Sequence, residues 1–148
     1  MKRLLRKQYV RRATTVVETA VMAPLIVTAM FGMLEVGYAF MVKQTVTLAA
    51  REGARAGALP GGNMNDVQAA ATAAMSAANL SGYSVTSNID SCGPTDLEVW
   101  VEVSIPLNRA SFTGSLLGGG SFDISARNSM RREGVDPTGP SGGIDPTP

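Results

Sequence analysis

The sequence predicts an α+β protein that is held in a membrane by a long amino-terminal helix. Three observations support this. An apolar run from residue 13 to 42 directly follows a cationic head, an alanine-rich segment follows residue 62, and the carboxyl-terminal half alternates apolar and polar residues. Alternation of this kind is typical of half-buried strands. A long helix, a second helix and a small antiparallel sheet of about three strands together form an α+β arrangement.

The amino-terminal head is strongly basic. Residues 1–12 hold six Lys or Arg and no acid, whereas the rest of the chain holds seven cations and twelve acids. A cationic segment before an apolar run keeps the amino end of a membrane protein in the cytoplasm. We therefore predict a basic cytoplasmic leader over residues 1–13. Elsewhere the sequence has no basic stripe with interleaved aromatics, so nucleic acid is not an expected partner.

The apolar run predicts a transmembrane helix over residues 14–42. Thirty helical residues cover about 45 Å, which exceeds the ~30 Å hydrocarbon core of a bilayer. The run is also longer than the ~7–15 apolar residues of a cleaved signal peptide. Its two acids, Glu18 and Glu35, enclose 16 uncharged residues and are expected near opposite faces of the bilayer. A carboxylate in such a segment is costly, which makes it a candidate functional residue.

Pro24 lies inside the predicted span. It lacks the N–H that an interior helical residue donates, so a kink or a local break is expected there. Membrane helices tolerate proline where side chains or neighbouring helices satisfy the freed carbonyl. Thr19 and Thr28 are available for such local bonds.

Residues 43–133 are predicted to form a region outside the cytoplasm, and the first helix is expected to continue to residue 58. Arg51 and Arg55 lie four apart on one face of that helix, and Glu52 lies three before Arg55. One interpretation is a solvated face with a weak ion pair. The other is a charged collar near the membrane surface that docks on a partner.

The rest of this region predicts one helix and three strands. Leu59-Pro60-Gly61-Gly62 ends the first helix, and Asn63 or Asn65 can cap a second helix over residues 66–79. Strands are expected over residues 83–89, over residues 97–105, and from Phe122 into SARNSM, with a loop at 107–121. Residues 134–148 are rich in Pro, Gly and Ser, so we expect a disordered tail.

Few residue types for catalysis or metal binding are present. The chain has no histidine, which removes His-based triads and most zinc sites. We expect no cofactor and no metal. Cys92 is the one cysteine, so it is either a free thiol or a residue that pairs between chains. Glu98 and Glu102 share one strand face with Trp100. They could form a catalytic carboxylate pair, or they could be a solvated surface.

Four segments occur in an order that is similar to a known family. They are RRATTVVETA (11–20), APL (23–25), FGMLEVG (31–37) and LAAREGARAG (48–57). Over Arg11–Gly57 the chain resembles the TadE-like proteins, which are pilin-like minor subunits of tight-adherence pilus systems. The resemblance implies a pilin-like fold.

The resemblance also implies processing. In prepilin-type proteins a membrane-embedded peptidase cuts after a small residue, and a glutamate stands at the fifth mature position. Glu18 is fifth if the cut falls between Ala13 and Thr14. The family more often has glycine before the cut and an aromatic residue after the glutamate, where this chain has Ala13 and Thr19. The new amine of Thr14 could be neutralised by Glu18 of a neighbouring subunit. Alternatively, Glu18 reaches the cytoplasmic interface.

Besides the membrane-tethered enzyme that a Glu98–Glu102 carboxylate pair would imply, two functional hypotheses follow. The first is a single-pass structural subunit in the bacterial cytoplasmic membrane and in a pilus. Its expected partners are the membrane, a prepilin-type peptidase, other pilin-like subunits and the assembly platform. In this hypothesis the chain has no catalysis, and the assembly residues are those in the family-like segments: Glu18, Pro24, Glu35, Arg51, Glu52 and Arg55. The second is a bitopic anchor that recruits a partner and never enters a filament. Leader removal distinguishes the two.

Overall fold

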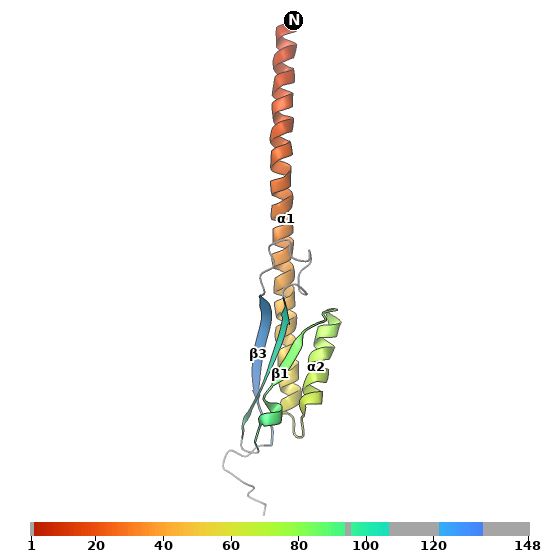
Figure 1. Ribbon diagram of the computed structural model, residues 1–148, viewed down its shortest axis with the longest axis vertical. Helices are drawn as coiled ribbons and strands as arrows, with labels where there is room; N and C mark the ends of the chain where they lie inside the picture. Colours follow the sequence, from red (N-terminus) through yellow and green to blue (C-terminus); the bar gives the residue numbers. More distant parts are fainter. Residues whose placement is uncertain (1, 94–95, 107–121, 135–148) are drawn as a thin grey trace, which may run out of the picture. The chain divides into compact units, whose positions relative to one another are not determined.

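The computed structural model describes residues 2–93, 96–106 and 122–134, with side chains from Thr14 onward (Figure 1). The chain divides into two units, Met1–Gly37 and Tyr38–Pro148, which are described separately below. The expected loop at 107–121 and nearly all of the expected tail lie outside the described residues. The architecture is α+β, as the sequence predicts.

The first unit is the amino-terminal part of helix α1 (Lys2–Ala58). Its apolar side chains are exposed along its described length: Val16 is 68% exposed, Leu25 62% and Met33 79%. By length and composition the helix could cross a membrane. Since no other element of this unit covers these side chains, they are available to lipid or to other helices.

Helix α1 continues through Pro24 without a break, so the expectation of a local break is wrong. Thr28 Oγ1 donates a hydrogen bond to the Pro24 carbonyl at 2.8 Å, and Thr19 Oγ1 donates to the Thr15 carbonyl at 2.9 Å. Both bonds join residues four apart. Neither reaches the Ala20 carbonyl, which is the one that Pro24 cannot serve.

The second unit contains the rest of α1, helix α2 (Met64–Ala77) and three strands. The strands β1 (Ser84–Ser87), β2 (Glu98–Pro106) and β3 (Asp123–Arg131) form an antiparallel sheet in the order β1-β2-β3. This agrees with the predicted second helix and three-stranded sheet. Strand β1 is shorter than predicted because residues 89–91 form the short helix η1 (Ile89–Ser91).

The core of this unit lies where α1, α2 and the sheet meet. Alternate residues of β2 are fully buried, as their period of two requires: Val99, Val101, Val103 and Ile105. Helix α2 contributes three residues at a spacing of four: Val67, Ala71 and Met75. Helix α1 contributes one face: Val42, Val46, Ala49, Ala50, Ala54 and Ala58. Each buried Val, Ile or Met contributes about 1.5–3 kcal/mol.

Two glycines on the same face of α1 let the core pack closely. A Cβ at Gly57 would lie 2.9 Å from Val67 Cγ2, 3.1 Å from Ile89 Cδ1 and 3.2 Å from Val99 Cγ1. A Cβ at Gly53 would lie 3.2 Å from Val101 Cγ1. These glycines cost helix propensity, about 1 kcal/mol each. The absence of a side chain lets α2 and the sheet approach the helix.

Helix α2 begins at a complete capping box. Asn63 Oδ1 accepts from the backbone N–H groups of Asn65 and Asp66, and Asp66 Oδ2 accepts from the N–H of Asn63. Asn63, one of the two predicted candidates, is therefore the cap. The helix ends before Asn79, whose φ of 55° is left-handed.

Candidate functional site

Glu18 lies within the exposed apolar surface of the first unit. Its carboxylate is exposed and has no hydrogen-bond or ion-pair partner among the residues that the structure describes. The neighbouring Val16 and Val17 are 68% and 64% exposed. A carboxylate in such surroundings is unfavourable in lipid unless it reaches water or a cation.

The predicted cleavage point lies within a helix. Residues 13 and 14 both belong to α1, which begins at Lys2. The side chain of Thr14 is exposed, and the side chain of Ala13 lies outside the description. The bond between them therefore belongs to a continuous helix in this uncleaved chain.

Glu35 differs from Glu18 in its surroundings. It is half-buried and takes part in an interaction within the chain. The two carboxylates are 17 residues apart, about 25 Å along a helix. The structure therefore does not bring them together. Pro24 lies between them, with its carbonyl bonded to Thr28.

The charged residues on the second part of α1 face away from the core. Arg51, Glu52 and Arg55 are all exposed. The buried residues lie between them in sequence and point to the opposite face, because 3.6 residues make one turn. The structure thus presents these three side chains as an outward-facing charged surface, with Leu48 beside them at 49% exposure.

The outer face of the sheet does not assemble a catalytic carboxylate pair. Glu98 and Glu102 are four residues apart on β2, about 13 Å along the strand. Trp100 lies between them and stacks with the Arg127 guanidinium, whose carbon is 3.8 Å from the ring centroid. The register places Glu98 opposite Arg131 and Glu102 opposite Arg127. Opposite charges across strands stabilise a sheet.

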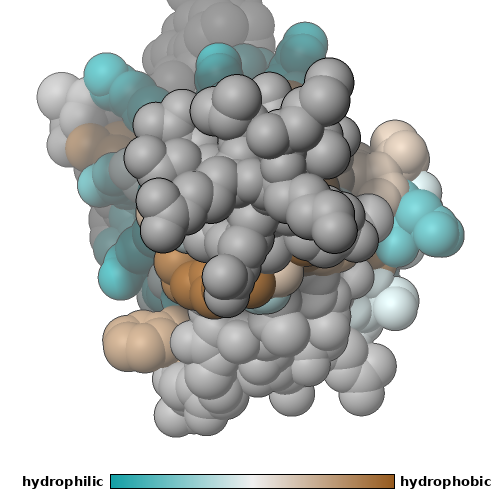
Figure 2. Space-filling model, turned by 90° about the horizontal axis from the view of Figure 1, so that it is seen from above, coloured by the Kyte–Doolittle hydropathy of each residue, from teal (hydrophilic) through white to brown (hydrophobic). Residues whose placement is uncertain are grey.

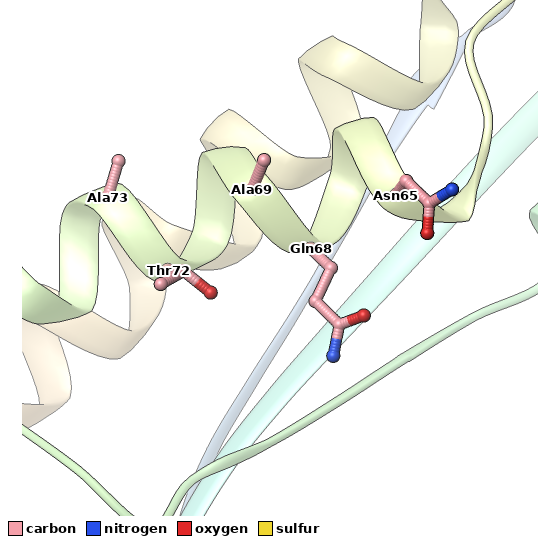
Figure 3. Close-up of a pocket in the computed structure, with 5 residues that line it drawn as sticks. All are labelled: Asn65, Gln68, Ala69, Thr72 and Ala73. Atoms are coloured by element: carbon pink, nitrogen blue, oxygen red, sulfur yellow. The ribbon is translucent and has the colours of Figure 1, made fainter.

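Few other residues in the described part of the chain are candidates for catalysis or metal binding. No group of His, Cys, Asp or Glu there could hold a metal ion. Cys92 is a half-buried free thiol whose Sγ lies 3.7 Å from the Glu98 carbonyl oxygen. A shallow depression is formed by α2 alone, and Figure 3 shows its lining: Asn65, Gln68, Ala69, Thr72 and Ala73. These side chains are small or uncharged, so the depression offers no acid, base or nucleophile pair.

Three features of the second unit were not predicted. The close packing at Gly53 and Gly57 could have been found from their spacing of four, which puts both on one helix face. Lys43 donates a hydrogen bond to the Ser125 carbonyl. Arg132 donates to the Gly93 carbonyl at 3.0 Å. Both cations bond to carbonyls distant in sequence, and sequence periodicity carries no signal for such contacts.

Comparison with known proteins gives one match. Residues 13–55 match the model of the family described as TadE-like protein, which confirms the resemblance over this segment. The matched segment is less than a third of the chain. No curated protein and no solved structure matches.

Proposed function

We propose that this protein is a membrane-anchored, pilin-like structural subunit that acts in assembly of a tight-adherence pilus. The observation that carries the proposal is the extent of the TadE-like match. Residues 13–55 comprise the exposed apolar helix of the first unit and most of the helix that builds the core of the second. The match thus covers the helix proposed as the membrane anchor and most of the helix on which the second unit folds.

The change from exposed to buried apolar side chains along α1 supports this function. The apolar side chains before Val42 include Val36, Phe40 and Met41, which are 54%, 66% and 44% exposed, whereas Val42 and Val46 are fully buried. An anchor with an exposed apolar surface suits a lipid bilayer and, after assembly, a bundle of similar helices. The second unit has its own core and can fold outside the membrane. With the basic leader in the cytoplasm, this unit lies on the outer side.

We propose that Glu18 pairs with the amine of a neighbouring subunit. A prepilin-type peptidase would cut between Ala13 and Thr14 and create an amine at Thr14, four residues before the carboxylate. A charge at the bilayer centre costs about 2.5–3.5 kcal/mol on insertion scales, and less near the edge. Pairing with an opposite charge reduces that cost. Because Glu18 has no partner in its own chain among the described residues, its carboxylate is available to a neighbour.

The test compares two carboxylates in one helix. Glu18→Val should insert into the membrane at least as well as wild type, because the span becomes more apolar, but less of it should co-purify with other pilus components. Glu35→Gln is the matched control, since Glu35 is half-buried and already interacts within its own chain. We expect it to have the smaller effect on assembly. If Glu18→Val assembles as well as wild type, charge pairing is refuted. The carboxylate of Glu18 in the wild-type chain then merely reaches the cytoplasmic interface.

The bitopic anchor is the second candidate. The helix of the full chain runs from the leader through residues 13 and 14 without a break, which is compatible with an anchor that keeps its leader. An anchor needs no leader removal, whereas a processed subunit does. The intact mass of the membrane-extracted protein therefore separates the two functions.

A further inference from the structure

Two contacts align β3 with α1 inside the second unit. Near the start of the strand, Lys43 Nζ donates a hydrogen bond to the Ser125 carbonyl. Just past its end, the N–H of Glu133 donates to the Ala58 carbonyl at 2.8 Å. Alternate residues of a strand direct their backbone groups to the same edge, so both contacts lie on the edge of β3 that faces away from β2.

The lengths between the two contacts agree. Eight residues of extended chain from Ser125 to Glu133 cover about 26 Å, and fifteen helical residues from Lys43 to Ala58 cover about 22 Å. Strand and helix therefore run side by side in the same direction. The start of β3 lies at the end of the unit where its part of α1 begins.

Phe122 lies farther still toward that end. It precedes Ser125 by three residues, about 10 Å of strand, which equals the rise of about seven helical residues. Counted back from Lys43, this distance passes Phe40 and Tyr38, so Phe122 lies at the end of the unit where its part of α1 begins. The side chain of Phe122 is 73% exposed and that of Phe40 is 66% exposed. These are the two phenylalanines that the structure describes in this unit.

Exposed apolar side chains gather at this end of the unit. Among its described residues, five large hydrophobics are exposed, and three of them lie at or before the level of Lys43: Phe40, Met41 and Phe122. Figure 2, seen from above, shows both hydrophobic (brown) and hydrophilic (teal) residues where the surface is coloured. Phenylalanine is one of the apolar residues that elements lying in the membrane interface insert beside their polar groups.

We propose that Phe122 enters the outer interface of the membrane, so that the second unit contacts the lipid surface through the start of β3 as well as through α1. The proposal rests on the membrane span of the proposed function. The occupant is lipid because Phe122 lies at the end of the unit where α1 enters it, and the residues of α1 up to 42 belong to the predicted membrane span. Lys43, one turn after Phe40, holds its ammonium on the Ser125 carbonyl and so keeps a cation beside the proposed contact.

The depth of this contact is limited by the next residue. Asp123 is exposed and stands opposite Pro106 at the end of the sheet. A carboxylate is costly in hydrocarbon, so the strand reaches the interface and goes no deeper. Phe122 is therefore expected at the depth of the headgroups and upper acyl chains.

The single tryptophan of the chain makes this depth measurable. In full-length protein carrying Trp100→Phe, a new tryptophan at one position is the only indole. We would reconstitute Phe122→Trp, Leu25→Trp and Leu59→Trp separately, at low protein-to-lipid ratio. The vesicles contain phosphatidylcholine and phosphatidylglycerol, with the phosphatidylcholine brominated either high or low on its acyl chains. Leu25 lies in the predicted span, and Leu59 is 49% exposed at the far end of α1.

We expect Phe122→Trp to lose fluorescence mainly to the bromines nearest the headgroups, Leu25→Trp to lose most to the deep bromines, and Leu59→Trp to lose little to either. Quenching of Leu25→Trp without quenching of Phe122→Trp would overturn the interfacial contact and leave the span intact. This would also be the result if Phe122 packed against another protein. Absence of quenching in Leu25→Trp would refute the span and the contact with it.

Discussion

Gly57→Ala should destabilise the second unit although alanine is the better helix former. The new Cβ would stand 2.9 Å from Val67 Cγ2 and within 3.2 Å of both Ile89 Cδ1 and Val99 Cγ1. Three elements meet at this point: α2, η1 and β2. Because each contact is a branched side chain already within the core, none can move aside freely.

The magnitude follows from two opposing terms. Overpacking of a filled core costs about 1–3 kcal/mol. The gain in helix propensity from Gly to Ala is about 1 kcal/mol. The net loss of unfolding free energy is therefore about 1 kcal/mol. For a unit of roughly 60–100 residues, this corresponds to a fall of about 4–8 °C in the unfolding midpoint.

Gly53→Ala is the matched control because it makes the same chemical change one turn earlier. Its Cβ would have contacts of 3.2 and 3.4 Å, so the smaller overpacking should be offset by propensity and leave the midpoint nearly unchanged. The assay is thermal unfolding of the full chain in detergent micelles, followed by the fluorescence of Trp100 on β2. This signal excludes any contribution from helix that persists in the micelle. The reasoning is refuted if Gly57→Ala unfolds at or above the midpoint of Gly53→Ala.

Three other predictions follow from the sequence and the contacts. Cells with the matching peptidase should yield a chain that starts at Thr14, measured by intact mass; a mature chain beginning at Met1 would contradict processing. Cys92 should be labelled from outside the cytoplasmic membrane by an impermeant maleimide, with denaturation if needed since the thiol is half-buried; labelling only after lysis of that membrane would invert the topology. Asn63→Ala should lower the free energy of unfolding by about 1 kcal/mol because the helix cap is lost. Gln68→Ala, an exposed change on the same helix, should have little effect. Equal losses in the two variants would show that the cap does not stabilise the unit.

The sequence predicted the elements well because each has a local signal. The period of two in residues 97–105 placed the buried face of β2, and Asn63 indicated the start of α2. Strand β1 was predicted too long because Ser87 and Asn88 bond to the Trp100 carbonyl and lead directly into η1. Tertiary contacts of this kind have no counterpart in local composition.

The candidate site could be predicted only in part. Glu18 was chosen as a candidate because a charge inside an apolar run is rare and costly, and its role stays a prediction. The outward direction of Arg51 and Arg55 followed from helical spacing. The role of Lys43 could not be predicted, since its partner Ser125 is 82 residues away and is a backbone carbonyl, which every residue has.

The segment LAAREGARAG (48–57) has a buried face and an exposed face. Its small residues, Ala49, Ala50, Gly53, Ala54 and Gly57, are buried against α2 and the sheet. Its charged residues remain exposed on the other face. The family match covers most of this segment and none of the elements packed on it. The segment therefore does two things at once: its small residues let α2 and the sheet pack closely on α1, and its charged residues keep the opposite face of the helix in solvent.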